Sequence, residues 1–219
     1  MTALNIITIQ LGIVNAYLLQ QKDDFILIDT GYSKNRKKLL EAIEKAGCSK
    51  GHLKLIVLTH ADKDHIGNAS YLRDVYETKL AMSKADSMMA ERGDQSSSRK
   101  SKPDHLSLLF KVVMAMGSTK DHQEGFIPDL TLVDGQSLEP FGFEATILAL
   151  PGHSKGSIGV YTSEGDLFCG DLIYNLPGFG YIDDEFEHTQ SINRIKQLHP
   201  RLIHPGHGKA FTLSKIQKD

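Results

Sequence analysis

Runs of apolar residues, separated by short polar turns, dominate the first sixty residues of the chain. Residues 5–19 are rich in Ile, Val and Leu with one interruption, which predicts a β-hairpin. Residues 25–28 and 53–58 are apolar runs of the kind found in buried strands. Apolar positions at helical spacing over 39–46 predict a helix that ends at Gly47. Both buried-type runs stop at polar residues, and layered folds display reactive groups at such strand ends.

The pattern changes after the second of these strands. We expect a helix to begin near Asp64, followed by a strand at 79–82, a helix from Lys84 and a polar, Ser-rich loop over 93–104. Residues 105–117 then form an apolar helix that needs cover on most sides. Three roles are open for this helix: part of the core, a lid over a site, or a contact in a homodimer.

Strand-like segments return in the second half of the chain. Apolar runs at 130–133, 143–150, 158–161 and 167–169 are punctuated by Gly, Pro and Asp, and a last helix covers residues 192–198. Two halves that are each rich in strands and each end in a helix predict two packed sheets with helices outside.

Length and charge narrow the picture further. The chain has 219 residues and no long linker, so we expect one domain over 1–219, with a helical insertion around 84–124. The net charge of -2 gives no reason to expect nucleic acid or an anionic membrane as partner. The one basic run, residues 99–102, is interpreted as a solvated loop.

The compartment follows from cysteine usage and from the N-terminal sequence. Cys48 and Cys169 lie far apart and do not resemble a disulfide framework, which favours a reducing environment. The N-terminal residues lack the pattern of a secretory signal, and no stretch approaches the ~20 apolar residues of a membrane span. We therefore expect a cytoplasmic protein that is not embedded in a membrane.

Seven residues of metal-binding type follow the ends of predicted strands. Taken singly, each is better explained as a surface histidine or a capping aspartate, and Asp64 could cap the helix that follows it. Together they indicate a Zn, Fe or Mn site. Alternation would project the side chains at 60, 62 and 64 the same way and turn His65 towards a second metal. The seven residues are His60, Asp62, Asp64, His65, His153, Asp171 and His207.

The order of these motifs resembles the metallo-β-lactamase-fold hydrolase superfamily over nearly the whole chain. Its five landmarks are matched by Asp29 in Leu27-Ile28-Asp29-Thr30-Gly31, by the segment 60–65, and by His153, Asp171 and His207. The resemblance implies an α+β fold, a four-layer αβ/βα sandwich, and a metal centre. It says little about substrate, because the superfamily includes thioesterases, lactonases, phosphodiesterases, nucleases and oxygen-using di-iron proteins.

The resemblance also implies two divalent metal ions, typically Zn. One ion would take His60, the residue at 62 and His153, and the other would take Asp64, His65 and His207. Asp171 would bridge the two ions, and Asp29 would orient the ligands through hydrogen bonds.

Position 62 departs from the family's usual His-x-His-x-Asp-His segment, because it holds aspartate instead of histidine. Carboxylate donation shifts metal preference from Zn towards Fe or Mn and weakens the Lewis acidity of the ion. The flavodiiron branch of the family is similar in having a carboxylate here. We favour a dinuclear site with Asp62 as ligand; the alternative is that Asp62 does not reach and leaves the first site weak or empty.

These features predict hydrolysis of a small-molecule ester, thioester or lactone. A bridging hydroxide would attack the substrate, and Asp64 would hold the nucleophile and pass its proton to the leaving group. Tyr174 lies at an offset that resembles family lactonases and could donate to the oxyanion; packing at a strand end explains it equally well. The loop 177–181 is a candidate for lining the pocket. The alternatives are a di-iron oxidoreductase, a phosphodiesterase, or a metal-binding scaffold without activity.

Overall fold

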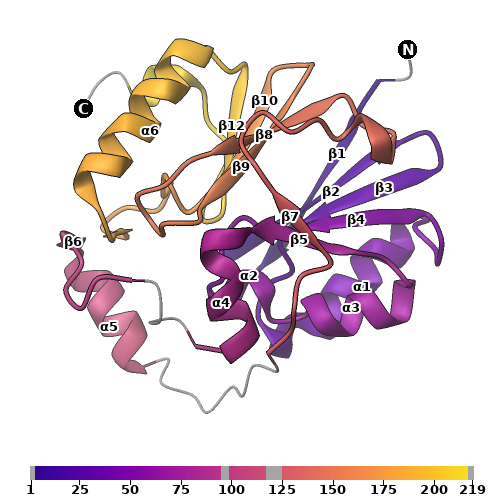
Figure 1. Cartoon of the computed structure of the whole chain (residues 1–219), viewed down its shortest axis with the longest axis horizontal. Coiled ribbons are helices and arrows are strands. Elements are labelled where there is room, and N and C mark those ends of the chain that lie inside the picture. The colour runs from indigo at the N-terminus through magenta and orange to yellow at the C-terminus, as the bar shows by residue number, and fades with distance from the viewer. Residues whose placement is uncertain (1–2, 95–98, 117–124, 217–219) are drawn as a thin grey trace.

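Two β-sheets packed face to face form the centre of the computed structural model, which describes residues 3–94, 99–116 and 125–216 (Figure 1). The first sheet has the order β1-β2-β3-β4-β5-β7 and the second has the order β12-β10-β9-β8. The strands of the first sheet are β1 (Asn5–Leu11), β2 (Val14–Gln21), β3 (Asp24–Ile28), β4 (Leu53–Val57), β5 (Leu80–Ser83) and β7 (Leu130–Leu132). Those of the second are β8 (Ala145–Ala149), β9 (Ile158–Thr162), β10 (Asp166–Gly170) and β12 (Leu202–Pro205).

Helices cover the outer face of each sheet. Side chains from α1, α3 and α4 join one core cluster with the first sheet, and side chains from α6 join another with the second. A third cluster fills the space between the sheets. The four-layer αβ/βα sandwich of the α+β class is therefore confirmed. The helices are α1 (Arg36–Lys45), α2 (Lys63–Ile66), α3 (Ala69–Tyr76), α4 (Lys84–Arg92), α5 (Leu108–Met116) and α6 (Glu185–Leu198).

The alternation of a β-strand explains how one strand serves two layers. On β2, Leu18 packs on the helical side of the first sheet and its neighbour Leu19 packs between the sheets. Leu55 and Ile56 divide in the same way on β4. Strands buried on both faces appear in the sequence as unbroken apolar runs, as these do.

One strand belongs to a different sheet from the one its position in the sequence suggests. Residues 130–133 follow the insertion, and their place in the chain groups them with the strands of the second half. In the structure β7 pairs in parallel with β5 and extends the first sheet, with Ala81 opposite Leu130. A short apolar run does not encode its partner strand, so the chain crosses between sheets after β7 and not before it.

The segment 84–124, expected from the sequence to be a helical insertion, contains α4, α5 and the short strand β6 (His105–Leu106). Residues 95–98 and 117–124 lie outside the described residues. β6 pairs with β11 (Tyr181–Ile182), which holds α5 away from the sandwich, beside the loop before α6 (Figure 1). Leu108, Leu109 and Val112 are exposed, so this face of α5 is not core.

No helix within the described ranges combines the length and apolar character that a membrane crossing requires.

Candidate metal centre

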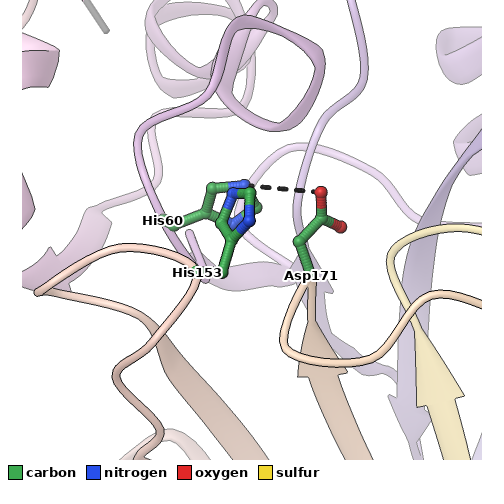
Figure 2. A group of neighbouring side chains, drawn as sticks. All are labelled: His60, His153 and Asp171. Atoms are coloured by element: carbon green, nitrogen blue, oxygen red, sulfur yellow. Dashed lines mark ion pairs between the residues drawn. The ribbon is translucent and has the colours of Figure 1, made fainter. Parts of the chain in front are cut away.

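The seven predicted ligands meet at one edge of the two sheets. The segment 59–65 follows β4, His153 follows β8, and Asp171 and His207 follow β10 and β12. β8 and β10 are both antiparallel to β9, and β10 is parallel to β12, so β8, β10 and β12 point the same way. Their C-terminal ends therefore carry side chains to a common place. Figure 2 shows His60, His153 and Asp171 reaching it from three loops.

A first cluster contains His60, Asp62 and His153. The Oδ2 atom of Asp62 lies 3.6 Å from Nε2 of His60 and 3.1 Å from Nε2 of His153. Asp171 lies beside it, with Oδ2 3.9 Å from Nε2 of His60, as the dashed line in Figure 2 marks. The short aspartate at 62 thus reaches the same point as the two imidazoles.

A second cluster contains Asp64, His65 and His207. Nε2 of His207 lies 3.3 Å from Oδ2 of Asp64 and 3.2 Å from Oδ2 of Asp171. Nε2 of His65 lies 3.2 Å from Oδ1 of Asp171. Asp171 therefore contacts both clusters. The centroids of the His60 and His65 rings are only 4.0 Å apart.

The chemistry of these atoms fits a metal ion. Nε2 of His60, Nε2 of His65 and Oδ1 of Asp171 are buried and have no hydrogen-bond partner among the described residues. Such orphaned atoms cost free energy unless a cation or water satisfies them. Burial alone would lower the pKa of His65, but neighbouring carboxylates, Asp171 first among them, raise it well above its usual value. That surplus of negative charge is what a divalent ion would neutralise.

Space at the centre depends on Gly206. A Cβ atom at this position would lie 2.1 Å from Oδ1 of Asp171 and 2.7 Å from the ring of His65. Only glycine lets the chain between β12 and His207 pass so close to the second cluster.

The prediction that the side chains at 60, 62 and 64 point the same way was wrong for Asp64. Residues 63–66 form a helical turn, and Asp64 lies with His65 and not with the side chains at 60 and 62. The residue at the N-cap of this turn is Asp62, whose side chain makes no capping hydrogen bond. The arrangement that the family resemblance implied, with Asp64 beside His65 and His207, is the one the structure contains.

Asp29 supports the second cluster from behind. Its backbone has a φ of 57°, an unusual conformation for a residue with a side chain. This turn aims Oδ2 at Nδ1 of His65, which donates to it over 2.8 Å, and at the hydroxyl of Thr59, also at 2.8 Å. Oδ1 accepts from the Thr59 N–H at 2.8 Å. Asp29 thereby fixes the ring of His65 with Nε2 facing the cluster.

Asp86 has a comparable supporting position that sequence reasoning missed. It is fully buried on α4, where its Oδ2 accepts from the Ala61 N–H at 3.1 Å and from the Ser154 hydroxyl at 2.7 Å. Its Oδ1 accepts from the Gly156 N–H at 2.8 Å. One carboxylate thus joins the 59–65 segment to the loop that carries His153. An aspartate in the first turn of a predicted helix looks like an ordinary dipole or capping residue, so the sequence offered no signal.

Arg99 corrects the interpretation of residues 99–102 as a solvated loop. Its side chain is only 10% exposed, and Nη2 donates to Oδ1 of Asp62 over 2.6 Å. Burial opposes the ionisation of Asp62, yet the guanidinium holds the pKa of that carboxyl well below its usual value. A buried carboxylate at a position where the family has histidine needs a positive charge beside it. That requirement could have indicated a basic partner such as Arg99 from the sequence.

Tyr174 lies against the first cluster with its hydroxyl 3.0 Å from Nδ1 of His153. Burial, followed by the charge of Asp171, raises the pKa of Tyr174 well above its usual value, so the phenol stays protonated. Its ring stacks on His207 at 5.5 Å between centroids. Phe110 and Phe179 pack beside it and give the centre an aromatic wall.

A pocket of about 450 Å³ lies next to this wall, between the 172–182 segment and α6. Phe179, Gly180 and Tyr181 of the predicted loop line it, as does His105. His188 also lines the pocket, whereas His204 is buried against Asp166 and His52 is exposed beside Asp24. His122 lies outside the described residues.

A four-layer sandwich with histidines and aspartates gathered at its strand ends defines a protein of the metallo-β-lactamase fold with a metal-ligand site. The sequence profile of the metallo-beta-lactamase superfamily matches residues 9–207. The chain therefore belongs to the metallo-β-lactamase superfamily, as its motifs indicated.

The individual relatives share about a quarter of their residues with this chain. The chain is 27% identical over 197 residues to a "Beta-lactamase-like protein 2 homolog" of Drosophila melanogaster, covering 90% of this chain but 59% of the relative. It is 27% identical over 201 residues to "Hydroxyacylglutathione hydrolase GloC" of Haemophilus influenzae, covering 88% of this chain and 84% of the relative. The crystal structure of TTHA1623 in a di-iron-bound form superposes with a TM-score of 0.69 at 27% identity, covering 96% and 95% of the two chains.

Proposed function

We propose that the chain is a metal-dependent hydrolase that cleaves a small ester, thioester or lactone at a centre of two divalent ions. The observation that carries this proposal is the meeting of both clusters at Asp171, which lies between them. The first cluster and the second would each hold one ion, with Asp171 shared. When bound, the ions would activate a water molecule for attack and polarise the oxygen of the scissile bond.

Asp64 is the most open of the clustered carboxylates, with 16% of its side chain exposed against 8% for Asp62 and 3% for Asp171. An exposed carboxylate oxygen can accept a proton from an attacking water and return it to the departing group. Asp64 therefore serves as the proton carrier, and His207, 3.3 Å away, orients it.

Tyr174 is placed to donate to the substrate. When Nε2 of His153 faces the cluster, its Nδ1 carries the hydrogen and donates to the Tyr174 hydroxyl oxygen. The tyrosine's own O–H can then donate to Asp171 or, in its place, to a substrate oxygen that gains negative charge. The aromatic wall of Phe110 and Phe179 would contact the apolar part of the substrate.

The relatives support the reaction class. The Haemophilus influenzae protein is named as a hydrolase of hydroxyacylglutathione, an acyl derivative, and it aligns along most of its length with this chain. Cleavage of an acyl bond by water is also the chemistry for which an open carboxylate and a phenol donor are suited. A phosphodiesterase ranks lower because a chain with net charge -2 offers no general attraction for polyanions.

A di-iron oxidoreductase is the second candidate. Asp62 gives the first cluster a carboxylate beside its two imidazoles, a donor set that favours Fe or Mn over Zn. TTHA1623, which is similar over almost its whole length, has been solved in a di-iron-bound form.

The test is reconstitution of metal-free protein with Zn²⁺, Fe²⁺ or Mn²⁺ in separate samples. Each sample is assayed with p-nitrophenyl acetate, an acyl thioester, a γ-lactone and bis-p-nitrophenyl phosphate, and for oxygen consumption with a thiol. We expect metal-dependent cleavage of at least one acyl substrate and a loss of on the order of 10²-fold in kcat for Tyr174→Phe. Oxygen consumption by the iron sample without cleavage of any acyl substrate would replace the hydrolase with the oxidoreductase.

A further inference from the structure

The first cluster already contains a cation that belongs to the chain. Nη2 of Arg99 lies 2.6 Å from Oδ1 of Asp62 and 3.1 Å from Nε2 of His153. We propose that Arg99 competes with metal for the first site, so that the second cluster fills first and the first fills only when the guanidinium leaves. This inference rests on the proposed function, because it requires that both clusters bind metal.

The competition is for the same atoms. Nε2 of His153 either accepts a hydrogen bond from Arg99 or donates one to Oδ2 of Asp62, at 3.1 Å in each case. Both roles occupy the nitrogen that a metal ion would use, since an imidazole binds metal through an unprotonated nitrogen. When Nε2 donates to Oδ2, both oxygens of the Asp62 carboxylate have a partner, because Oδ1 accepts from Arg99. A metal ion and the guanidinium therefore cannot hold this pair of ligands together.

Charge gives the same result. Asp62 adds one negative charge to a cluster whose other two members are imidazoles, and the guanidinium supplies one positive charge. A divalent ion that approached the first cluster with Arg99 in place would find the negative charge of Asp62 already neutralised by the guanidinium. The second cluster differs, because among the described residues the ion-pair partners of Asp64 and Asp171 there are histidines.

The surroundings hold Arg99 in this position. Its guanidinium carbon lies 4.9 Å from the centroid of the Tyr181 ring, a cation–π contact. The next residue is anchored through its backbone, because the Lys100 N–H donates to Oδ1 of Asp183 over 3.1 Å. Pairing of β6 with β11 continues the attachment of this segment. The position of the guanidinium is thus built by several contacts and does not depend on Asp62 alone.

The arrangement is nevertheless one that metal can displace. Nε of Arg99 is buried without a hydrogen-bond partner among the described residues, which makes this position of the guanidinium less favourable. Departure to solvent would satisfy that N–H and leave Asp62 and His153 to a metal ion. The first cluster accordingly has two alternative states, one closed by arginine and one that binds metal.

The first experiment uses the unchanged protein and Zn²⁺ alone. Metal-free protein is titrated by calorimetry, and crystals with one and with several equivalents of Zn²⁺ are compared by anomalous scattering. We expect a tight ion at Asp64, His65 and His207 first, with Arg99 still on Asp62. With excess Zn²⁺ we expect a weaker ion at the first cluster and Arg99 displaced. Equal filling of both sites at one equivalent, or a full first site with Arg99 unmoved, overturns the proposal.

The second experiment removes the competing charge. Arg99→Gln is expected to raise the Zn²⁺ affinity of the first site by on the order of 10- to 100-fold and to leave the second site unchanged. Lys102→Gln is the matched control, because it removes an exposed cation from the same segment and should change neither affinity. Two sites with unchanged affinities in Arg99→Gln overturn the competition but leave the proposed function intact. Failure of both proteins to bind Zn²⁺, Fe²⁺ or Mn²⁺ overturns both proposals.

Discussion

The two ligand clusters share Asp171, but the negative charge of their carboxylates is neutralised by different groups. In the second cluster the carboxylates pair with histidines within the described part of the chain, and Asp29 holds the ring of His65 with Nε2 turned toward the cluster. In the first cluster the additional carboxylate of Asp62 is paired with a buried arginine. Because position 62 holds a carboxylate, the proposed competition makes metal binding at the first cluster depend on Arg99, whereas binding at the second cluster does not. Similar ligand sets can therefore differ widely in how readily they accept metal.

Loss of a histidine from each cluster is the most direct way to test this difference. His207→Gln should lower kcat/KM by on the order of 10³-fold, about 4 kcal/mol of transition-state stabilisation, because the site that fills first is lost. His60→Gln should cost about tenfold less, since the first site is occupied in a smaller fraction of the molecules. Both variants are assayed at a fixed Zn²⁺ concentration with an acyl substrate, and circular dichroism checks that both are folded. Equal losses would show that the clusters are functionally equivalent.

Removal of the charge behind the second cluster should have the next largest effect. Asp29→Asn keeps an acceptor for the Thr59 N–H but weakens the bond from Nδ1 of His65. We expect the Zn²⁺ affinity of the second site to fall by about 10- to 100-fold while the first site is little changed. Asp24→Asn, at the partly exposed start of β3, the strand that ends just before Asp29, is the control. An equal fall at both sites would mean that Asp29 acts through the fold and not through His65.

The sequence predicted which residues gather at the metal centre, for a physical reason. Polar residues that follow buried strands are placed by the strands themselves, and strand ends in a layered fold meet at one edge. His153, Asp171 and His207 could therefore be grouped from the strand pattern alone. The four-layer fold was predictable on the same grounds, because runs buried on both faces require two covering layers.

What the sequence could not supply depends on contacts between distant segments. Arg99 lies 37 residues from Asp62, in a polar stretch whose composition is typical of solvent-exposed loops. The sheet to which β7 belongs is likewise decided by pairing with β5 and not by its own apolar pattern. Asp64 was turned away from the expected direction because a helical turn begins at residue 63, and element boundaries are weakly encoded.

Asp86 offers a way to disturb the first cluster without touching a ligand. Asp86→Asn replaces a carboxylate that accepts from Ala61, Ser154 and Gly156 with an amide that has one acceptor oxygen. We expect a loss of about 1–3 kcal/mol in the free energy of unfolding, measured by urea denaturation of the metal-free protein. Asp74→Asn, on an exposed side chain of α3, should change it little. A stability equal to that of the unchanged protein would show that the loop of His153 is held by other contacts.

The smallest effect is expected at Lys100, and it separates a buried charge from an exposed one in the same segment. Nζ of Lys100 lies 2.9 Å from carboxylates of Asp104 and Asp184, all at the surface, whereas Arg99 is enclosed. Exposed pairs contribute little because water and salt screen them, so Lys100→Gln should alter first-site Zn²⁺ affinity by less than about threefold. Calorimetric titration at low and high salt measures this change, and high salt should abolish it. The backbone bond from Lys100 to Asp183 survives the substitution and keeps Arg99 in place. A change as large as that of Arg99→Gln would mean that the segment, and not the guanidinium itself, controls the first cluster.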